Sequence, residues 1–143
     1  MDARQLTPRY NVSPQISVQD LPVIAAAGFT TVICNRPDVE IPSEQQSAAI
    51  RAAAEAAGLN FEVLELTHQT MTVENVARQK ALVEASDGPV LAYCASGTRC
   101  SVVWALGQAG ETPVDEILAT AAAAGYNLEN LRPALMQLAA QKA

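Results

Sequence analysis

Long apolar runs, basic clusters and a leader-like N-terminus are missing from this sequence of 143 residues. No window approaches the ~20 consecutive apolar residues of a membrane span. Met1 to Gln5 lack the apolar centre of a signal peptide. The formal net charge is −6, and no run of lysine or arginine occurs. We therefore expect neither nucleic acid nor a membrane as a partner.

Cysteine and histidine are also scarce. The chain has three cysteines without a Cys-x-x-Cys pair, and a single histidine, which disfavours both a structural zinc site and a disulfide scaffold. This cysteine usage is typical of a reducing compartment and predicts a cytoplasmic protein. Hydrophobic residues make up 50% and charged residues 17%, as in folded globular proteins. The length predicts one domain over residues 1–143.

Short apolar runs rich in β-branched residues alternate with helical patterns along the chain. Strands are predicted over 10–13, 29–34, 61–66 and 89–93. Helices are predicted over 18–27, from a capping box at 43–46 to 57, over 73–85 with Thr72 or Thr70 as the cap, over 99–109, from Pro113 to 124, and over 128–141. Trp104 is expected in the core. The alternation predicts an α/β fold of three layers, with a mostly parallel central sheet flanked by helices.

The most informative stretch joins the last predicted strand to the helix over 99–109. It reads Tyr93-Cys94-Ala95-Ser96-Gly97-Thr98-Arg99. A small-residue loop at a helix N-terminus turns backbone N–H groups inward and adds a partial positive charge, which favours anion binding. The sequence therefore predicts an anion-binding loop over Ala95, Ser96, Gly97, Thr98 and Arg99. The loop lies at the carboxyl end of a parallel strand, where open α/β sheets place their ligands.

Cys94 and Arg99 are the candidate catalytic residues. The positive field of the loop lowers the pKa of Cys94 and favours the nucleophilic thiolate. The planar guanidinium of Arg99 can hold two oxygens of an anion. This arrangement is typical of an enzyme that attacks a tetrahedral oxyanion or a sulfane sulfur. The alternative is structural, with Cys94 as a buried strand-end residue, Gly97 as a turn residue and Arg99 as a solvated side chain.

The loop resembles the active-site loops of two groups of thiol enzymes. Protein tyrosine and dual-specificity phosphatases have five residues between cysteine and arginine, whereas rhodanese sulfurtransferases commonly have four, as here. The helices predicted after the loop helix resemble the phosphatases instead. Over essentially its full length the chain resembles the bacterial phosphatase-like domain of β-lactamase-hydrolase-like proteins. The matching segments are Val12-Ser13-Pro14-Gln15-Ile16, Ile33-Cys34-Asn35-Arg36-Pro37-Asp38, Gly88-Pro89-Val90-Leu91-Ala92-Tyr93-Cys94, Ser96-Gly97-Thr98-Arg99, Trp104-Ala105-Leu106 and Ala124-Gly125-Tyr126.

This resemblance implies a protein-tyrosine-phosphatase-like fold, and phosphatase or sulfurtransferase activity, since members are described as both. Phosphatases usually place serine or threonine directly after the arginine, where Cys100 stands here with Ser101 behind it. The resemblance thus implies that the Cys100 and Cys94 sulfurs lie close together. Such proximity would allow a Cys94–Cys100 disulfide or a persulfide relay between the two sulfurs. The alternative for Cys100 is a small buried helix residue.

A second departure concerns the general acid. Phosphatases use an aspartate on a loop before the cysteine, and the matching stretch 64–70 contains none. His68 is the candidate acid there, with an exposed loop residue as the alternative. Arg36 either adds charge to the site or pairs with Asp38 or Glu40, and we favour the structural role. Cys34 is expected to pack in its strand rather than act as a resolving thiol.

Three functions remain open on the sequence. The leading hypothesis is a sulfurtransferase with a persulfide on Cys94, because sulfite and thiolates leave without a proton. A phosphate ester expels an alkoxide, so a missing acid would cost about 10²–10⁴ in rate. The first alternative is nevertheless a protein-tyrosine or dual-specificity-like phosphatase, a hydrolase with a phosphocysteine on Cys94. The second alternative is an inactive anion-binding module.

Each hypothesis predicts a small anionic partner: thiosulfate or a persulfide in one case, a phosphate ester in the other. Neither reaction requires a metal or an organic cofactor. The alanine-rich segments 48–57 and 119–124 can pack within the chain or form a homo-oligomer surface.

Overall fold

A five-stranded sheet forms the centre of the computed structural model, which describes residues 1–142. The strands are β1 (Arg4–Thr7), β2 (Tyr10–Ser13), β3 (Thr31–Cys34), β4 (Asn60–Val63) and β5 (Val90–Tyr93). They lie in the order β1-β2-β5-β3-β4. Strands β2, β5, β3 and β4 are parallel, and β1 pairs antiparallel with β2 at the edge. The predicted mostly parallel sheet is confirmed.

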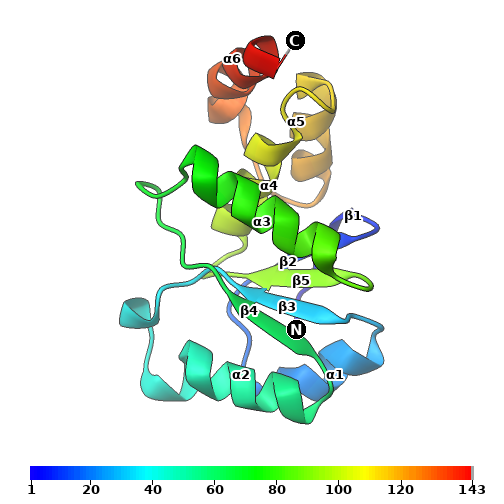
Figure 1. The fold of residues 1–143 in the computed structure, drawn as a ribbon, viewed down its shortest axis with the longest axis vertical. Helices are drawn as coiled ribbons and strands as arrows, with labels where there is room; N and C mark the ends of the chain where they lie inside the picture. The colour runs from blue at the N-terminus through cyan, green and yellow to red at the C-terminus, as the bar shows by residue number, and fades with distance from the viewer. Residues whose placement is uncertain (143) are drawn as a thin grey trace.

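Helices cover both faces of this sheet (Figure 1). Helices α1 (Leu21–Ala26) and α2 (Ser47–Ala56) lie on one side. Helices α3 (Val73–Ala85), α4 (Thr98–Gln108), α5 (Val114–Ala123) and α6 (Arg132–Lys142) lie on the other. The 3-10 turns are η1 (Val18–Asp20), η2 (Asp38–Glu40), η3 (Ser43–Gln45) and η4 (Glu129–Leu131). None of the helices in residues 1–142 combines the length and hydropathy of a membrane span.

Strand β5 is buried along its whole length because it lies between β2 and β3 under helices on both sides. Val90 and Ala92 pack into the core beneath α4, α5 and α6. Leu91 and Tyr93 pack into the opposite core, beneath α1 and α2. A strand buried on both faces reads as a continuous apolar run, which explains why the sequence predicts it. Its rigid surroundings fix the position of Cys94 at its carboxyl end.

Two helix starts differ from the predictions. The prediction of a capping box at 43–46 is wrong, because these residues form η3 and its C-cap, and α2 begins at Ser47. The Ser47 N–H and hydroxyl donate to the Asp38 carboxylate at 2.7 and 3.0 Å, so the acceptor for the helix start comes from nine residues earlier. Helix α5 begins after Pro113, which is the N-cap rather than the first helical residue. Of the two candidate caps for α3, Thr72 is the one that forms, since its hydroxyl accepts from the Asn75 N–H at 3.1 Å.

Strand boundaries differ as well. Strand β1 was not predicted, because an edge strand with one buried residue carries no clear apolar pattern. Strand β4 ends at Val63 rather than at residue 66. The Leu64 and Leu66 N–H groups still donate to Cys34 and Asn35 carbonyls at 2.9 and 2.8 Å, but β3 itself has ended there. The last helix begins at Arg132, behind η4, rather than at 128.

Candidate active site

Cys94 lies at the carboxyl end of the central strand β5, with 1% of its surface exposed. The next three residues turn sharply, and α4 begins at Thr98. Gly97 makes the turn with a φ of +95°, in the left-handed region that glycine adopts without strain. The predicted strand, loop and helix are therefore present, and the loop is the α4 N-terminus.

The carbonyl groups of the loop are held on its outer side. The Ala95 carbonyl accepts from the Gln15 N–H at 3.3 Å. The Ser96 carbonyl accepts from the Tyr126 hydroxyl at 2.9 Å. The Gly97 carbonyl accepts from the Ser101 hydroxyl at 2.8 Å and from its N–H at 3.0 Å. These bonds fix the loop with its carbonyls bound to the scaffold, so that N–H groups turn toward the sulfur.

Hydrogen-bond donors surround the Cys94 sulfur. The Cys100 thiol is the strongest of them, and the N–H groups of Cys100, Gly97 and Arg99 add to it. The Gly97 nitrogen lies 3.1 Å from the sulfur. These donors outweigh burial, which opposes them, and lower the pKa of Cys94 to about 5. Cys94 is therefore a thiolate at neutral pH.

Cys100 is fully buried in the first turn of α4. Burial, together with its contact to Cys94, raises the pKa of the Cys100 thiol well above its usual value. It therefore stays protonated and acts as a donor to the thiolate. Ser101 is also fully buried, but its hydroxyl binds the Gly97 carbonyl. The structure thus brings Cys100 to Cys94, as the resemblance implied, and gives Ser101 a role in holding the loop.

Arg99 is held by a carboxylate that the sequence analysis did not assign to the site. Its two terminal nitrogens each donate to one Glu40 oxygen at 2.8 Å. One of them also donates to the Leu66 carbonyl at 2.9 Å. The ion pair with Arg99 is the main reason that the pKa of Glu40 is lowered. Glu40 precedes Arg99 by 59 residues, so no local spacing could predict this pair.

Arg36 supports Glu40 rather than the loop. Its Nε donates to Glu40 at 3.2 Å and one terminal nitrogen donates to the Gln15 side chain at 3.3 Å. The favoured structural role thus agrees with the observed pairing, which is with Glu40 and not with Asp38. Cys34 is fully buried in the opposite core, where its thiol donates to the Arg36 carbonyl at 3.4 Å.

An open cleft of about 460 Å³ lies above the loop. It is lined by Glu40, Thr67, His68, Gln69, Ala95, Ser96, Thr98 and Arg99. His68 and Arg99, which are far apart in the sequence, therefore share one cavity. In residues 1–142 no three His, Cys, Asp or Glu side chains are grouped as metal ligands.

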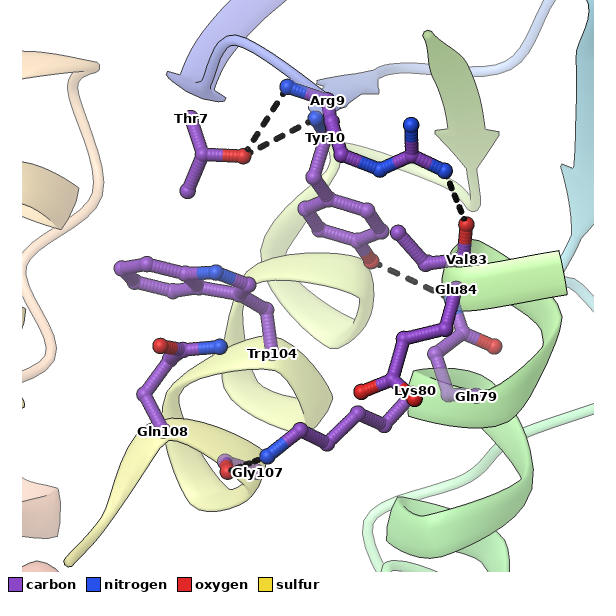
Figure 2. Close-up of a pocket in the computed structure, with 10 residues that line it drawn as sticks. All are labelled: Thr7, Arg9, Tyr10, Gln79, Lys80, Val83, Glu84, Trp104, Gly107 and Gln108. Atoms are coloured by element: carbon purple, nitrogen blue, oxygen red, sulfur yellow. Dashed lines mark hydrogen bonds between the residues drawn. The ribbon is translucent and has the colours of Figure 1, made fainter. Parts of the chain in front are cut away.

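A second cavity of about 190 Å³ lies behind the site, between α3, α4 and the β1–β2 hairpin (Figure 2). Neither Cys94 nor Arg99 lines it. Trp104 borders this cavity and is half-buried, and it packs against the core cluster that includes Cys100, as predicted. Trp104 lies one residue beyond the buried Val103, and in Figure 2 its ring lies between Thr7 and Gln108.

A buried polar chain runs from this second cavity to the first turn of α4. The Tyr10 hydroxyl donates to the Cys100 carbonyl at 2.8 Å and accepts from the Gln79 amide at 3.1 Å, the latter bond drawn in Figure 2. Gln79 exchanges two hydrogen bonds of 2.9 Å with Asn35, whose amide also donates to the Leu64 carbonyl at 2.8 Å. The chain ties α3 to β2 and to the ends of β3 and β4.

Comparisons with known sequences agree with this geometry. Residues 2–111 match the family model of the β-lactamase hydrolase-like protein, phosphatase-like domain. A β-lactamase hydrolase-like protein of Agrobacterium fabrum is 34% identical over 110 residues, which are 76% of this chain and 25% of that protein. The chain thus spans about a quarter of the length of this curated relative.

Solved structures share the fold. A Neisseria meningitidis protein described as a candidate phosphatase superposes with a TM-score of 0.87 at 40% identity, over 96% of this chain and 99% of that chain. Tk-PTP in its active form gives a TM-score of 0.70 at 14% identity, over 99% and 98% of the two chains. A cysteine-to-serine variant of P. aeruginosa TpbA in complex with phosphotyrosine gives a TM-score of 0.60 at 17% identity, over 94% of this chain and 90% of that chain. The last two likenesses concern the fold alone, which is that of protein-tyrosine-phosphatase-like proteins.

Proposed function

Because this chain belongs to the family of phosphatase-like domains of β-lactamase hydrolase-like proteins, we propose that it hydrolyses phosphate monoesters through a phosphocysteine on Cys94. The arrangement around Cys94 carries this proposal. A thiolate lies at the base of a loop of N–H donors, and Arg99 and His68 line one cleft with the loop residues Ala95, Ser96 and Thr98. Donors fixed in advance are the means by which enzymes stabilise a developing oxyanion.

In the first step the Cys94 thiolate attacks the phosphorus atom, and the bond from phosphorus to the ester oxygen breaks. Arg99 and the loop N–H groups hold the equatorial oxygens of the transferring group. The leaving oxygen takes a proton from His68. In the second step water attacks the phosphocysteine, the sulfur–phosphorus bond breaks, and neutral His68 accepts a proton from that water. Phosphate leaves and the thiolate is restored.

Besides Arg99, two titratable side chains line the cleft, Glu40 and His68, and we assign the proton donor to His68. The pKa of Glu40 is lowered by Arg99 and Arg36, so Glu40 stays ionised and has no proton to give. Glu65 does not line the cleft, and its carboxylate accepts from the Asp38 N–H at 3.2 Å. This leaves the role of general acid to His68.

Sulfur transfer, the leading hypothesis from the sequence, has no support in the family model or in the structural matches. They favour the phosphatase alternative instead. The short spacing between Cys94 and Arg99 remains the feature that rhodanese loops share with this chain. Both reactions start from the same thiolate, so a direct comparison of substrates is required.

The test is to assay the reduced protein separately with an aryl phosphate and with thiosulfate. We expect the native protein to release phosphate and Cys94→Ser to release none. When the reaction of the native protein with the aryl phosphate is quenched in acid, the protein should carry the added mass of one phosphoryl group. A gain of one sulfur atom from thiosulfate, with no phosphate release, would refute the proposal. Anion binding without turnover on either substrate would instead support a binding module.

His68 is tested by its dependence on the leaving group. An alkyl phosphate needs the acid, so His68→Asn should slow its hydrolysis by about 10²–10⁴, whereas an aryl phosphate with a good leaving group should be slowed far less. Gln69→Asn, in the same cleft, is the matched control and should affect both substrates equally. Equal losses on both substrates in His68→Asn would remove His68 as the acid.

A further inference from the structure

Hydrogen-bonding side chains make up most of the lining of the cleft that Arg99 and His68 share. Three hydroxyl groups, one amide and one carboxylate belong to Thr67, Ser96, Thr98, Gln69 and Glu40. Ala95 is the remaining lining residue. Hydroxyl and amide groups both donate and accept hydrogen bonds. The cleft is therefore suited to a ligand that carries hydroxyl groups of its own.

The phenylalanine, tyrosine and tryptophan side chains are placed elsewhere in the fold. Phe29, Phe61 and Tyr93 pack in the core beneath α1 and α2. Tyr10 and Trp104 border the second cavity (Figure 2), and Tyr126 binds the outer side of the loop through its hydroxyl. An aromatic leaving group gains binding energy from apolar or aromatic walls. This cleft offers it hydroxyl, amide and carboxylate groups instead.

Glu40 places a negative charge beside the position of the phosphate. Its two oxygens accept from the terminal nitrogens of Arg99 at 2.8 Å, and this ion pair lowers the pKa of Glu40, which is therefore ionised at neutral pH. A second phosphate or a carboxylate on the substrate would meet a like charge there. A hydroxyl group next to the phosphate can instead donate to the carboxylate. The charge thus favours a substrate with a single anionic group.

We propose that the substrate is the monophosphate of a small hydroxylated alcohol, a sugar or a polyol, and that Gln69 binds its hydroxyl groups. This inference rests on the proposed function, in which Cys94 attacks a phosphate monoester. The cleft volume of about 460 Å³ lies within the range of about 300–1,000 Å³ that is typical of small-molecule sites. The alkoxide of such an alcohol is a poor leaving group, which agrees with a general acid at His68.

The test is calorimetric titration of Cys94→Ser, which keeps the loop but lacks the nucleophilic sulfur. The probes are glucose 6-phosphate, fructose 1,6-bisphosphate, phosphotyrosine and inorganic phosphate. We expect glucose 6-phosphate to bind at least about 10-fold more tightly than each of the other three, since a few additional hydrogen bonds are worth about that factor. With the native protein, kcat/KM should be higher for glucose 6-phosphate than for phosphotyrosine.

Gln69→Leu, made in the Cys94→Ser protein, replaces the exposed amide by an apolar group of similar size. It should weaken the binding of glucose 6-phosphate by about 3–10-fold and leave inorganic phosphate unaffected, because only the sugar contacts the amide. Gln141→Leu, the same change at an exposed position of α6, is the matched control and should bind every probe as Cys94→Ser does.

Tighter binding of phosphotyrosine than of glucose 6-phosphate would overturn the proposal, even if the native protein hydrolyses both. Equal binding of glucose 6-phosphate and inorganic phosphate, or equal effects of Gln69→Leu and Gln141→Leu, would overturn it as well. The titration needs no turnover. Preferential binding of glucose 6-phosphate by Cys94→Ser, with no phosphate released by the native protein from any ester, would therefore support the ligand class and refute only the proposed function.

Discussion

The reactivity of Cys94 depends on a buried, neutral side chain and on the backbone N–H groups of the loop. The Cys100 thiol is the largest of the contributions that lower the pKa of Cys94, ahead of the loop N–H groups. Arg99 in turn is oriented by the Glu40 carboxylate, which lies in the same cleft. Each of these contacts can be removed one side chain at a time.

We expect alkylation of Cys94 by iodoacetamide to follow a pH midpoint of about 5, because the thiolate is the reacting form. The rate should be high above that midpoint and fall as the pH drops through it. Cys100→Ala removes the main donor and should move the midpoint upward. The measurement is the labelling rate of Cys94 across pH, followed on the tryptic peptide 81–99 that contains it. A midpoint near 8.5, the value of a free cysteine, would contradict the thiolate assignment.

Glu40→Gln should lower kcat/KM for an aryl phosphate by about 10–100-fold, because a small misplacement of a group that contacts the reacting phosphate is costly. The amide removes the charge that holds both terminal nitrogens of Arg99. Glu44→Gln, an exposed carboxylate in η3, is the matched control and should have little effect. A higher activity in Glu40→Gln would mean that Glu40 competes with the substrate for Arg99.

At the scale of elements, the loop between β5 and α4 is held by segments from both ends of the chain. Tyr126, in the connection after α5, donates to the Ser96 carbonyl at 2.9 Å. Arg4 of β1 stacks over the Tyr126 ring, 5.3 Å from its centre, and donates to the Ala124 carbonyl at 3.3 Å. A Cβ on Gly97 would overlap the Tyr126 hydroxyl. The close approach, as well as the positive φ, requires glycine there.

Gly97→Ala should therefore lower phosphatase activity by at least about 10²-fold, because the loop donors are displaced from their positions. Gly58→Ala provides the control: its φ is +83°, but nothing lies within 4 Å of an added Cβ. Both variants should lose about 1 kcal/mol or more of stability from backbone strain, measured by urea unfolding. Only Gly97→Ala should lose activity, and a comparable loss in Gly58→Ala would disprove the argument from the Tyr126 contact.

At the scale of the whole molecule, the polar chain through Tyr10, Gln79 and Asn35 joins three parts of the fold behind the loop. All three side chains are buried. Their hydrogen bonds cross between β2, the end of β3 and α3, and reach α4 at the Cys100 carbonyl. A buried polar network of this kind stabilises the fold only while every member keeps its partners.

Gln79→Leu should destabilise the protein by about 1–3 kcal/mol, since the side-chain amide oxygen of Asn35 would be left buried without a donor. Urea unfolding monitored by circular dichroism measures this change. Gln141→Leu, at an exposed position of α6, is the control and should stay within about 0.5 kcal/mol of the native protein. An equal effect of both substitutions would show that the network adds nothing specific.

The sequence by itself determined the parts of this protein that depend on neighbours along the chain. The central strand β5, the loop from Cys94 to Arg99 and the cap at Thr72 were predictable, because burial on both faces, tight turns and helix starts leave local patterns. The position of Cys100 near Cys94 followed from the family resemblance. The predicted sheet follows from the alternation of strands and helices.

Only the tertiary structure decided the contacts between distant segments. Glu40 and Arg99 are 59 residues apart, and Tyr126 and Ser96 are 30 apart. No periodicity links such pairs, because their meeting depends on how strands are ordered in the sheet and on how helices pack against it. The same reason explains the wrong capping box at 43–46 and the missed edge strand β1. The nucleophile and the anion-binding loop are thus visible in one short stretch of sequence, whereas the contacts that orient and support them come from the fold.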